Sequence, residues 1–553
     1  MKHLIFVLAA ASLLSAKSLD SACQIIPVDY QYTVPRFGIP EHALAGVSLR
    51  AALGEFECAA FVVHAQSPLK MVSVEVSEFV NSSTGRKIPG DSISVRYAEY
   101  AYIDSGKKEE RPVFLRKMGP LPLKADENRE FWITLRSGNV SDTGVFKGQV
   151  TVKGEGCLCV KEIAFEVLPF RLKRSGGPAN SACIGLYPGI SAAYMRDLRD
   201  HGINTLHFFW GRGFFLLSNV SGEPRVDFVN ADPFFGNLKA CGFKSVIVVL
   251  GNDAKGHFDR DICNAFPPLH LDTTQNANGK TKYAGPLNNP RFDSLYVDAL
   301  GQLKSRVESF GLELMLHIYD EATERFTVEN AYRAKIIRKA FPGLQLTGDV
   351  MEEGVTQGLR EIMAASDILF DGGESLFVRA PLEQKSGKGI WMFNFLGADC
   401  EAGFVRARAG FYPLKFNPRG TDFWAYNFNM NDPYVQREAF FQDASATVIF
   451  PTAEGDSVST PDPSIAWEGH REANDDKDYF LTLSTMLSKT QTPLGKKIAA
   501  DLSALKEGWQ RISGKNKHPD YSFPDVARSS CVKWILSLIR ENPAKYRDMG
   551  ILP

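Results

Sequence analysis

The sequence lacks an excess of charge of either sign, since its 553 residues include 63 basic and 64 acidic side chains. Without a surplus of lysine and arginine, the chain as a whole has no field that would hold nucleic acid or an anionic membrane. Its 44% hydrophobic and 23% charged residues are close to the globular average, which excludes a disordered, collagen-like or disulfide-dense protein. The length predicts about two to four domains.

The sequence also lacks the short motifs of several enzyme classes. It contains no G-x-S-x-G, Walker A loop or H-E-x-x-H, so serine-hydrolase, nucleotide-binding and zinc-protease functions have no support. Nine cysteines are scattered without a C-x-x-C pair, which argues against a zinc or redox motif. Cys157 and Cys159 lie two positions apart in a predicted strand and therefore face the same side. We interpret the cysteines as buried free thiols, and we expect no metal and no cofactor.

Long hydrophobic runs are missing too, because no stretch approaches the ~20 residues that a membrane-spanning helix needs. The apolar run at residues 4–14 follows Lys2 and His3 and precedes small residues, a pattern typical of a secretory signal. We assign residues 1–22 to a signal peptide and expect a secreted, periplasmic or cell-surface protein. Cys23 follows a poor lipobox, because Asp20 stands where a small or aliphatic residue is expected. A lipid anchor at Cys23 is the alternative.

The part of the chain that follows this signal is rich in short β-type runs. Between residues 23 and 172, runs such as 57–64 and 131–135 are separated by turn residues, and helical periodicity is nearly absent. Short, evenly spaced strands predict a β-sandwich domain over 23–172. A polar, turn-rich linker follows at 173–178.

From residue 178 to 460 the chain alternates between apolar runs and helical patterns. The clearest helical pattern covers 292–310, with apolar residues spaced by three and four. Eight strand-helix units over roughly 250 residues favour a (β/α)8 barrel. An open doubly wound sheet is less well supported, because no G-x-G-x-x-G follows the first strand. The predicted strands are 183–187, 204–209, 245–251, 313–319, 345–350, 367–371, 389–394 and 421–428.

The remaining residues, 461–553, have helical patterns. An apolar stripe runs from Tyr479 to Leu487, and further helices are predicted near 499–512 and 526–540. We therefore predict a C-terminal helical segment packed on the barrel. The overall fold class is a multidomain α/β plus all-β protein, with an N-terminal β-sandwich, a (β/α)8 barrel and a helical extension.

In such a barrel, ligands bind at the carboxyl ends of the strands. The predicted ends are rich in acids, amides and aromatics and poor in cations, which suits a neutral sugar. The fourth predicted strand ends directly before Asp320 and Glu321. Two neighbouring carboxyls at the end of a buried strand raise the pKa of at least one of them, as a general acid requires. Alternatively, Asp320 caps a turn and Glu321 pairs with Arg325.

The spacing of these two acids also constrains the mechanism. Neighbours on an extended strand point to opposite faces, so both reach one pocket only if the strand breaks there. The usual retaining and inverting glycosidases hold their two carboxyls ~5–5.5 Å or ~6.5–9.5 Å apart, from different strands. Adjacent acids fit a substrate-assisted mechanism better, in which the acetamido oxygen of the sugar attacks the anomeric carbon.

The strand end Tyr319-Asp320-Glu321-Ala322 resembles the catalytic signature of glycoside hydrolase family 123 and its domain-of-unknown-function relatives. The segments 54–57, 144–152, 422–427 and 455–479 are similar to other parts of that family, so the resemblance covers about residues 45–485. It implies a β-sandwich followed by a catalytic barrel that acts on β-linked N-acetylgalactosamine. It further implies Glu321 as the general acid/base and Asp320 as the group that stabilises the acetamido. Where relatives usually read Arg-Glu-Gly, this chain has Arg471-Glu472-Ala473, which suggests a divergent branch.

Other residues at the predicted strand ends are candidates for binding a glycan. Trp424 and Tyr426 alternate on one strand and should share a face, so both line the pocket or both fill the barrel. Asn394 either hydrogen-bonds a sugar or forms a turn. The remaining candidates, chosen by position, are Tyr319, Trp210, His207 and Glu374. Arg471 is expected to pair with an acid of its own helix.

These observations together predict a secreted glycoside hydrolase, an exo-acting β-N-acetylhexosaminidase of N-acetylgalactosamine type with substrate-assisted, retaining catalysis. One alternative is a non-catalytic carbohydrate-binding or scaffold protein on the same fold. Another is a glycosidase for a sugar without an acetamido group, which would need a second carboxylate such as Asp371 or Glu374. The expected partner is a glycan or glycoconjugate, with no nucleic acid, and the sequence leaves the oligomeric state open.

Overall fold

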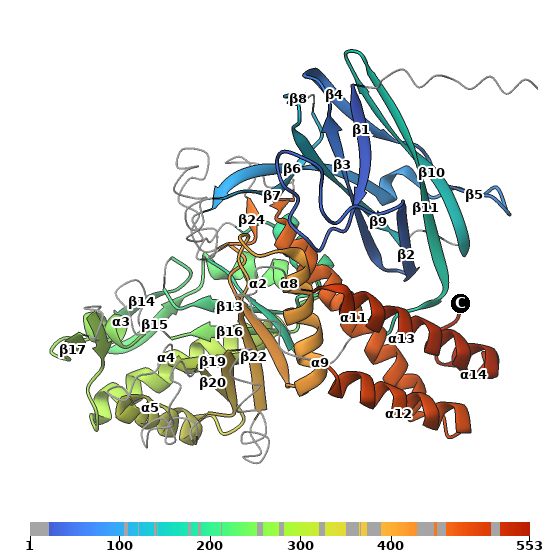
Figure 1. Ribbon diagram of the computed structural model, residues 1–553. Coiled ribbons are helices and arrows are strands. Elements are labelled where there is room, and N and C mark those ends of the chain that lie inside the picture. Colours follow the sequence, from blue (N-terminus) through green and yellow to red (C-terminus); the bar gives the residue numbers. More distant parts are fainter. Residues whose placement is uncertain are drawn as a thin grey trace, which may run out of the picture.

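The computed structural model describes most of the 553-residue chain (Figure 1). The described residues are 22–103, 109–119, 121–137, 140, 142–174, 179–185, 190–211, 213–250, 258–275, 281–319, 327–349, 364, 366–372, 389–427, 447–450, 460–509 and 520–553.

The N-terminal part forms two β-sheets. The first has the strand order β1-β3-β9-β6-β7, and its neighbours are antiparallel. The second has the order β2-β11-β10-β4-β8, in which β2 runs parallel to β11, and β5 pairs with β10. The elements are β1 (Cys23–Val28), β2 (Val47–Leu53), β3 (Phe56–Ala65), β4 (Leu69–Val76), β5 (Val80–Asn81), η1 (Gly90–Ser92), β6 (Ile93–Ile103), β7 (Glu109–Lys117), β8 (Leu121–Leu123), β9 (Asn128–Arg136), β10 (Gly144–Gly154) and β11 (Cys157–Arg171).

Side chains from both sheets form one buried core. Phe61 on β3 and Phe131 on β9 stack with ring centroids 5.4 Å apart, and Val150 and Phe165 of the second sheet belong to the same cluster. On β10 buried and exposed residues alternate, as expected for a strand with one face on a core. The predicted β-sandwich is therefore confirmed.

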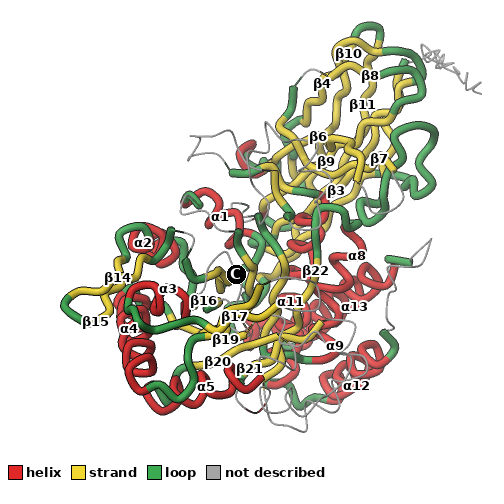
Figure 2. The backbone as a smooth tube through the Cα atoms, turned by 90° about the vertical axis from the view of Figure 1, so that its left-hand side faces the viewer, coloured by secondary structure: helices red, strands yellow, loops and turns green. Residues whose placement is uncertain are grey.

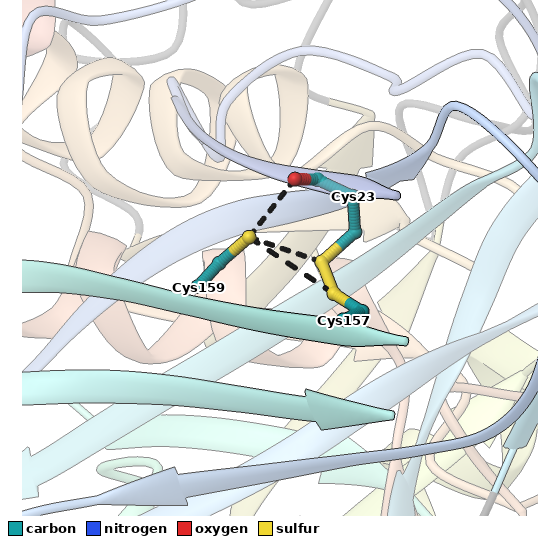
Figure 3. A group of neighbouring side chains, drawn as sticks. All are labelled: Cys23, Cys157 and Cys159. Carbon is teal, nitrogen blue, oxygen red and sulfur yellow. Dashed lines mark hydrogen bonds between the residues drawn. A yellow bond between two sulfur atoms is a disulfide. The ribbon is translucent and has the colours of Figure 1, made fainter. Parts of the chain in front are cut away.

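A disulfide joins the two sheets at one end. Cys23 on β1 is bonded to Cys157 on β11, with a Cα–Cα distance of 6.1 Å (Figure 3). The interpretation of all cysteines as free thiols is wrong for this pair, because the sandwich brings together strands that are 134 positions apart in the sequence. The structure gives no support for the alternative of a lipid anchor at Cys23.

Eight parallel strands form a closed barrel in the order β12-β13-β16-β19-β20-β21-β22-β23. Buried residues such as Ile247, Met315 and Phe370 fill its interior, whereas Leu206 and Phe208 face the surrounding helices. The predicted closed barrel of eight strands is thus present. Its strands are β12 (Ala179–Cys183), β13 (Thr205–Phe209), β16 (Ser245–Val249), β19 (Glu313–Tyr319), β20 (Gln345–Asp349), β21 (Ile368–Gly372), β22 (Gly389–Phe395) and β23 (Gly420–Trp424).

Helices and two hairpins connect the strands. The predicted helix at 292–310 is present as α4, and it begins where Asn289 accepts hydrogen bonds from the backbone N–H groups of Arg291 and Phe292. The β20–β21 and β21–β22 connections lie largely outside the described residues, so the complete (β/α)8 alternation is not covered. The elements are α1 (Ala192–Asp200), β14 (Leu216–Val220), β15 (Glu223–Asp227), α2 (Ala231–Ala240), α3 (Phe258–Ala265), β17 (Asp272–Gln275), β18 (Thr281–Ala284), α4 (Pro290–Ser309), α5 (Thr327–Ala340), α8 (Ala402–Arg406), η4 (Ala407–Phe411) and α9 (Tyr412–Phe416).

Two barrel strands have a boundary that differs from the prediction by more than two residues. The first barrel strand was expected at 183–187, but β12 ends at Cys183. The reason is that Ser181, a small polar residue, occupies a buried position on this strand, so hydrophobicity does not mark it. The last strand was expected to reach 428, whereas β23 ends at Trp424.

The C-terminal part packs between the sandwich and the barrel. In Figures 1 and 2, α11 and α13 lie where the two lobes meet, and α11 contacts β3, β7 and α13. The predicted helical character is confirmed by α11 (Ile465–Ser488), α12 (Pro493–Glu507), α13 (Ser522–Glu541) and α14 (Pro543–Asp548), preceded by the short strands β24 (Ile449–Phe450) and β25 (Asp462–Pro463). Among the described helices, none has the length and apolar character needed to cross a membrane.

A buried ionic network holds these parts together. Arg528 on α13 donates to Asp476 at 2.5 Å and to Glu57 of the sandwich at 3.1 Å. It also lies 2.9 Å from Glu472 and 3.7 Å from Glu55. One guanidinium thus faces four carboxyl groups from the sandwich and from α11, which explains why so many polar residues of α11 are buried.

Candidate active site

The mouth of the barrel is the rim at which the parallel strands end. Because parallel strands point the same way, their carboxyl ends lie together, and barrel enzymes bind their ligands there. The residues that end these strands are Cys183, Phe209, Val249, Tyr319, Asp349, Gly372, Phe395 and Trp424.

Below the mouth, His207 and Asp422 form a buried polar pair in the barrel interior. The Nδ1 atom of His207 on β13 lies 2.7 Å from Oδ2 of Asp422 on β23. A carboxylate accepts, so this Nδ1 carries the hydrogen and leaves Nε2 as an acceptor in the neutral ring. Within the described part of the chain, His207 Nε2 and Asp422 Oδ1 have no hydrogen-bond partner. Both atoms are buried inside the barrel.

A second histidine, His317 on β19, lies beside this pair. Its ring centroid is 5.3 Å from that of His207, and its Nδ1 is 3.0 Å from the hydroxyl of Thr347. The ring of Phe370 is 5.2 Å from His317 and 5.5 Å from Trp391. The interior beneath the mouth is therefore polar on the side of β13, β19 and β23 and aromatic on the side of β21 and β22.

The predicted catalytic pair, Asp320 and Glu321, lies outside the described residues, and so does Glu374. The backbone of Tyr319, the residue before the pair, is the last of β19 and is paired with Gly348. His317 is paired with Thr347, so the register shifts between His317 and Tyr319. β19 is thus irregular immediately before the two acids. Irregularities of this kind, such as β-bulges, are common next to active sites.

Trp424 is at the mouth. It ends β23 and is half-buried, and its ring lies 6.1 Å from that of Phe209 and nearly perpendicular to it. Phe209 ends β13. The two rings therefore lie at neighbouring points of the rim, above the His207–Asp422 pair.

Tyr426 does not share the face of Trp424, which corrects the prediction. Its side chain is fully buried, and its hydroxyl donates to Asp197 on α1 at 2.8 Å. The ring packs on Trp467 of α11, as does Phe423. The alternation ends with β23 at Trp424, so Tyr426 faces the helices. Burial raises the pKa of Tyr426 well above its usual value.

Trp210 and Asn394 are also turned away from the mouth. Trp210 is fully buried, donates to Asp261 at 2.9 Å and stacks on Phe215. Asn394 is buried as well and accepts a hydrogen bond of 3.2 Å from Arg408. It has the same strand parity as Met392, which packs on Tyr412 outside the barrel. Asn394 therefore connects β22 to a covering helix. The structure supports neither the predicted sugar-binding role nor the predicted turn-forming role of this residue.

The sequence prediction missed His317 and Asp422 as site residues. A usable signal was present, because each precedes a selected residue by two positions, His317 before Tyr319 and Asp422 before Trp424. Residues two apart on a strand share a face. Arg471, in contrast, pairs with Glu468 on its own helix as expected.

A possible metal-binding group is found elsewhere. Among the described residues, the sulfur atoms of Cys23, Cys157 and Cys159 lie within 4.8 Å of one another. Figure 3 shows Cys159 beside the disulfide, with its Sγ 3.1 Å from that of Cys23. Thiolates bind metals and disulfides do not, so in this state the group is not a metal site. It also lies in the sandwich and not at the mouth.

Comparisons with known proteins find a strong similarity in structure. No protein-family model and no curated protein matches the sequence. A family 123 glycoside hydrolase from Clostridium perfringens superposes with a TM-score of 0.68 and 12% identity, covering 96% of this chain and 100% of that one. An endo-β-1,4-mannanase from Thermotoga petrophila (TM-score 0.35, 12% identity, 55% and 77% covered) and a putative α-galactosidase from Bacteroides fragilis (0.27, 11%, 76% and 81%) are much less similar. The resemblance drawn from the sequence thus holds at the level of the fold, and over nearly its whole length the chain has the fold of a family 123 glycoside hydrolase.

Proposed function

We propose that this protein is a glycoside hydrolase that acts at the mouth of its barrel. The observation that carries the proposal is the position of β19. It is the fourth strand in barrel order and ends at Tyr319, the residue before Asp320 and Glu321. Acids that follow a barrel strand stand where barrel enzymes carry out their chemistry. The similarity in fold to a protein studied for glycolipid glycan hydrolysis supports the same conclusion.

Within this class we propose an exo-acting β-N-acetylhexosaminidase of N-acetylgalactosamine type. In the proposed mechanism, Glu321 protonates the glycosidic oxygen while the acetamido oxygen of the sugar attacks the anomeric carbon. Asp320 holds the acetamido N–H and stabilises the oxazolinium. Glu321 then removes a proton from the water that opens this intermediate, with retention of configuration.

The irregular end of β19 supports the use of two neighbouring acids. On a regular strand they would point to opposite faces, but a bulge changes the direction of the side chains that follow it. The register shift between His317 and Tyr319 is a feature of this kind. Trp424 offers a partly exposed ring for the face of a sugar, and His207 Nε2 offers an acceptor for a hydroxyl.

The experiment is a release assay on a panel of aryl glycosides with purified wild type and Glu321→Gln. We expect hydrolysis of the aryl β-N-acetylgalactosaminide and a loss of about 10²–10⁴-fold in kcat in the variant. Glu308→Gln is the matched control, because Glu308 lies on the outside of α4 and pairs with Lys304. A thiazoline mimic of the oxazolinium should inhibit the wild type.

Each other outcome selects an alternative. An active enzyme that ignores the thiazoline would use a second carboxylate, such as Asp371 or Glu374, on a sugar without an acetamido group. Sugar binding without turnover of any glycoside would make the protein a carbohydrate-binding or scaffold protein and reject the enzymatic proposal. Secretion through residues 1–22 is proposed separately, and it is tested by N-terminal sequencing of the exported protein.

A further inference from the structure

A large cavity lies at the opposite end of the barrel from the mouth. Its volume is about 600 Å³, within the range of roughly 300–1,000 Å³ typical of small-molecule sites. It is lined by Asn180 of β12 and Gly420 of β23, which belong to the amino ends of these strands. Because each strand spans about 16 Å, the cavity is separate from the proposed catalytic site. Phe56 of the sandwich and Leu481 of α11 complete its walls.

The lining of this cavity is strongly positive. The sequence as a whole has a net charge of −1, whereas five cationic and two acidic side chains line the cavity, a local surplus of three positive charges. The cations come from β9, the linker, α1, α11 and α12 and are Arg136, Arg174, Arg199, Lys477 and Lys506. The acids are Asp200 and Asp478.

Among the described residues, one of these five cations forms direct ion pairs, while Asp200 acts electrostatically on Arg199 and Asp478 on Lys477. Arg174 is paired with Asp475 and Asp478, at 3.2 and 3.3 Å. The other four form no ion pair with any residue that the structure describes. The Arg136 guanidinium packs on the ring of Phe56, 5.1 Å from its centroid.

The two lysines are partly removed from water. The Lys506 ammonium lies 5.9 Å from the centroid of the Phe480 ring, and burial lowers its pKa. Burial lowers the pKa of Lys477 to about 8. Burial therefore disfavours the charged form of both ammonium groups, and the nearby Asp478 offsets only part of this effect at Lys477, so an incoming anion would stabilise them further.

Several neutral polar groups of the cavity are engaged within the protein. Asn180 donates to Asn474 at 2.9 Å and accepts from Thr421 at 2.6 Å. Its backbone N–H donates to Asn204 at 2.8 Å. Because these amides and this hydroxyl satisfy one another, they have little left to offer a neutral sugar. The rest of the lining includes the cations, the polar residues Asn417 and Ser484, and the apolar surfaces of Leu414 and Leu481.

We propose that this cavity binds a small organic oxyanion, a molecule that carries carboxylate, phosphate or sulfate groups on a compact body. Arginine and lysine bind these groups through charge-assisted hydrogen bonds, and the apolar walls contact the body of the ligand. Since the walls belong to the sandwich, the barrel and the C-terminal helices, the bound anion joins all three. The site is independent of the proposed hydrolase function.

The test is calorimetric titration of the full chain with citrate, inorganic phosphate and inorganic sulfate at low ionic strength. We expect saturable one-site binding of at least one of them. Binding of citrate alone identifies a carboxylate ligand, and binding of phosphate or sulfate alone identifies a tetrahedral oxyanion. Absence of saturable binding for all three would overturn the proposal.

Variants show whether the cavity is responsible. Lys506→Gln and Arg136→Gln should each weaken binding by about tenfold or more, because each removes a cation from the lining. Lys496→Gln is the matched control, since Lys496 is exposed, lies on the same helix as Lys506 and does not line the cavity. Equal weakening by the control would show a diffuse surface effect and reject the site. Circular dichroism verifies that each variant is folded.

Discussion

Glu130 on β9 is a buried carboxyl group in the sandwich. Within the described part of the chain its Oε2 atom has no hydrogen-bond partner, and burial alone raises its pKa to about 8. The folded protein therefore holds a proton at neutral pH that the unfolded chain releases. A single side chain thus makes the stability of the sandwich depend on pH.

The sign of this dependence follows from proton linkage. Between the ordinary pKa of a glutamate and about pH 8, the folded state binds more protons than the unfolded state, so stability falls as the pH rises. We expect Glu130→Gln to remove a dependence of about 1.4 kcal/mol per pH unit. Urea denaturation of both proteins at several values between about pH 5 and pH 8 measures it. Parallel curves for wild type and variant would contradict the assignment.

For single residues, the sequence analysis could use the position at a strand end but not the direction in which the side chain points. Position alone selected His207, whose side chain lies in the barrel interior. It selected Trp210 and Tyr426 as well, but both are buried against helices and loops outside the barrel. Which way a side chain points after a strand ends depends on tertiary packing, and periodicity carries no information on it.

The contact between β13 and β23 is the element-scale feature of the candidate site. These strands are not neighbours, since β12 lies between them in the barrel, and the His207–Asp422 hydrogen bond spans that gap. It therefore connects strands across the point where the barrel closes.

Removal of the Asp422 side chain should weaken this connection. We expect Asp422→Ala to lower the free energy of unfolding by about 1–3 kcal/mol, because it leaves His207 Nδ1–H buried without an acceptor. Asp422→Asn keeps an acceptor oxygen and should cost less. Urea denaturation distinguishes the two. Equal losses would mean that the hydrogen bond is not the source of the effect.

Most elements were predictable because their apolar residues are regularly spaced. Strand 313–319 coincides with β19, and the helix at 292–310 with α4. β12 was misplaced, since it is built from small and polar residues. The bulge in β19 could not be predicted either, because a register shift depends on the neighbouring strand.

The sandwich is fastened at one end by the Cys23–Cys157 disulfide, with a third sulfur beside it. Cys159 Sγ is 3.1 Å from Cys23 Sγ. At the scale of the whole molecule, this disulfide closes a loop that contains nearly the entire sandwich.

The third sulfur should replace the second when the second is removed. We expect Cys157→Ser to form a Cys23–Cys159 disulfide under air oxidation, seen by mass spectrometry of non-reduced peptides. The double variant Cys157→Ser, Cys159→Ser should lose the disulfide and about 2–5 kcal/mol of unfolding free energy. A free Cys23 thiol in the single variant would show that Cys159 cannot take this role.

The order of sandwich, barrel and helices was predictable from changes in composition along the chain. The way these parts are joined was not. Arg528 meets Glu55 and Glu57 across the whole sequence, and no local pattern records such a contact.

This long-range contact has a consequence for biosynthesis. Glu57 is synthesised 471 residues before Arg528. The backbone N–H of Arg171 donates a hydrogen bond to the carbonyl of Ile551, which is also made near the end of translation. In the complete fold, burial raises the pKa of both Glu55 and Glu57 well above the usual value, and Arg528 on α13 acts in the opposite direction. The contacts between the sandwich and α13 can therefore form only after almost the whole chain has been synthesised.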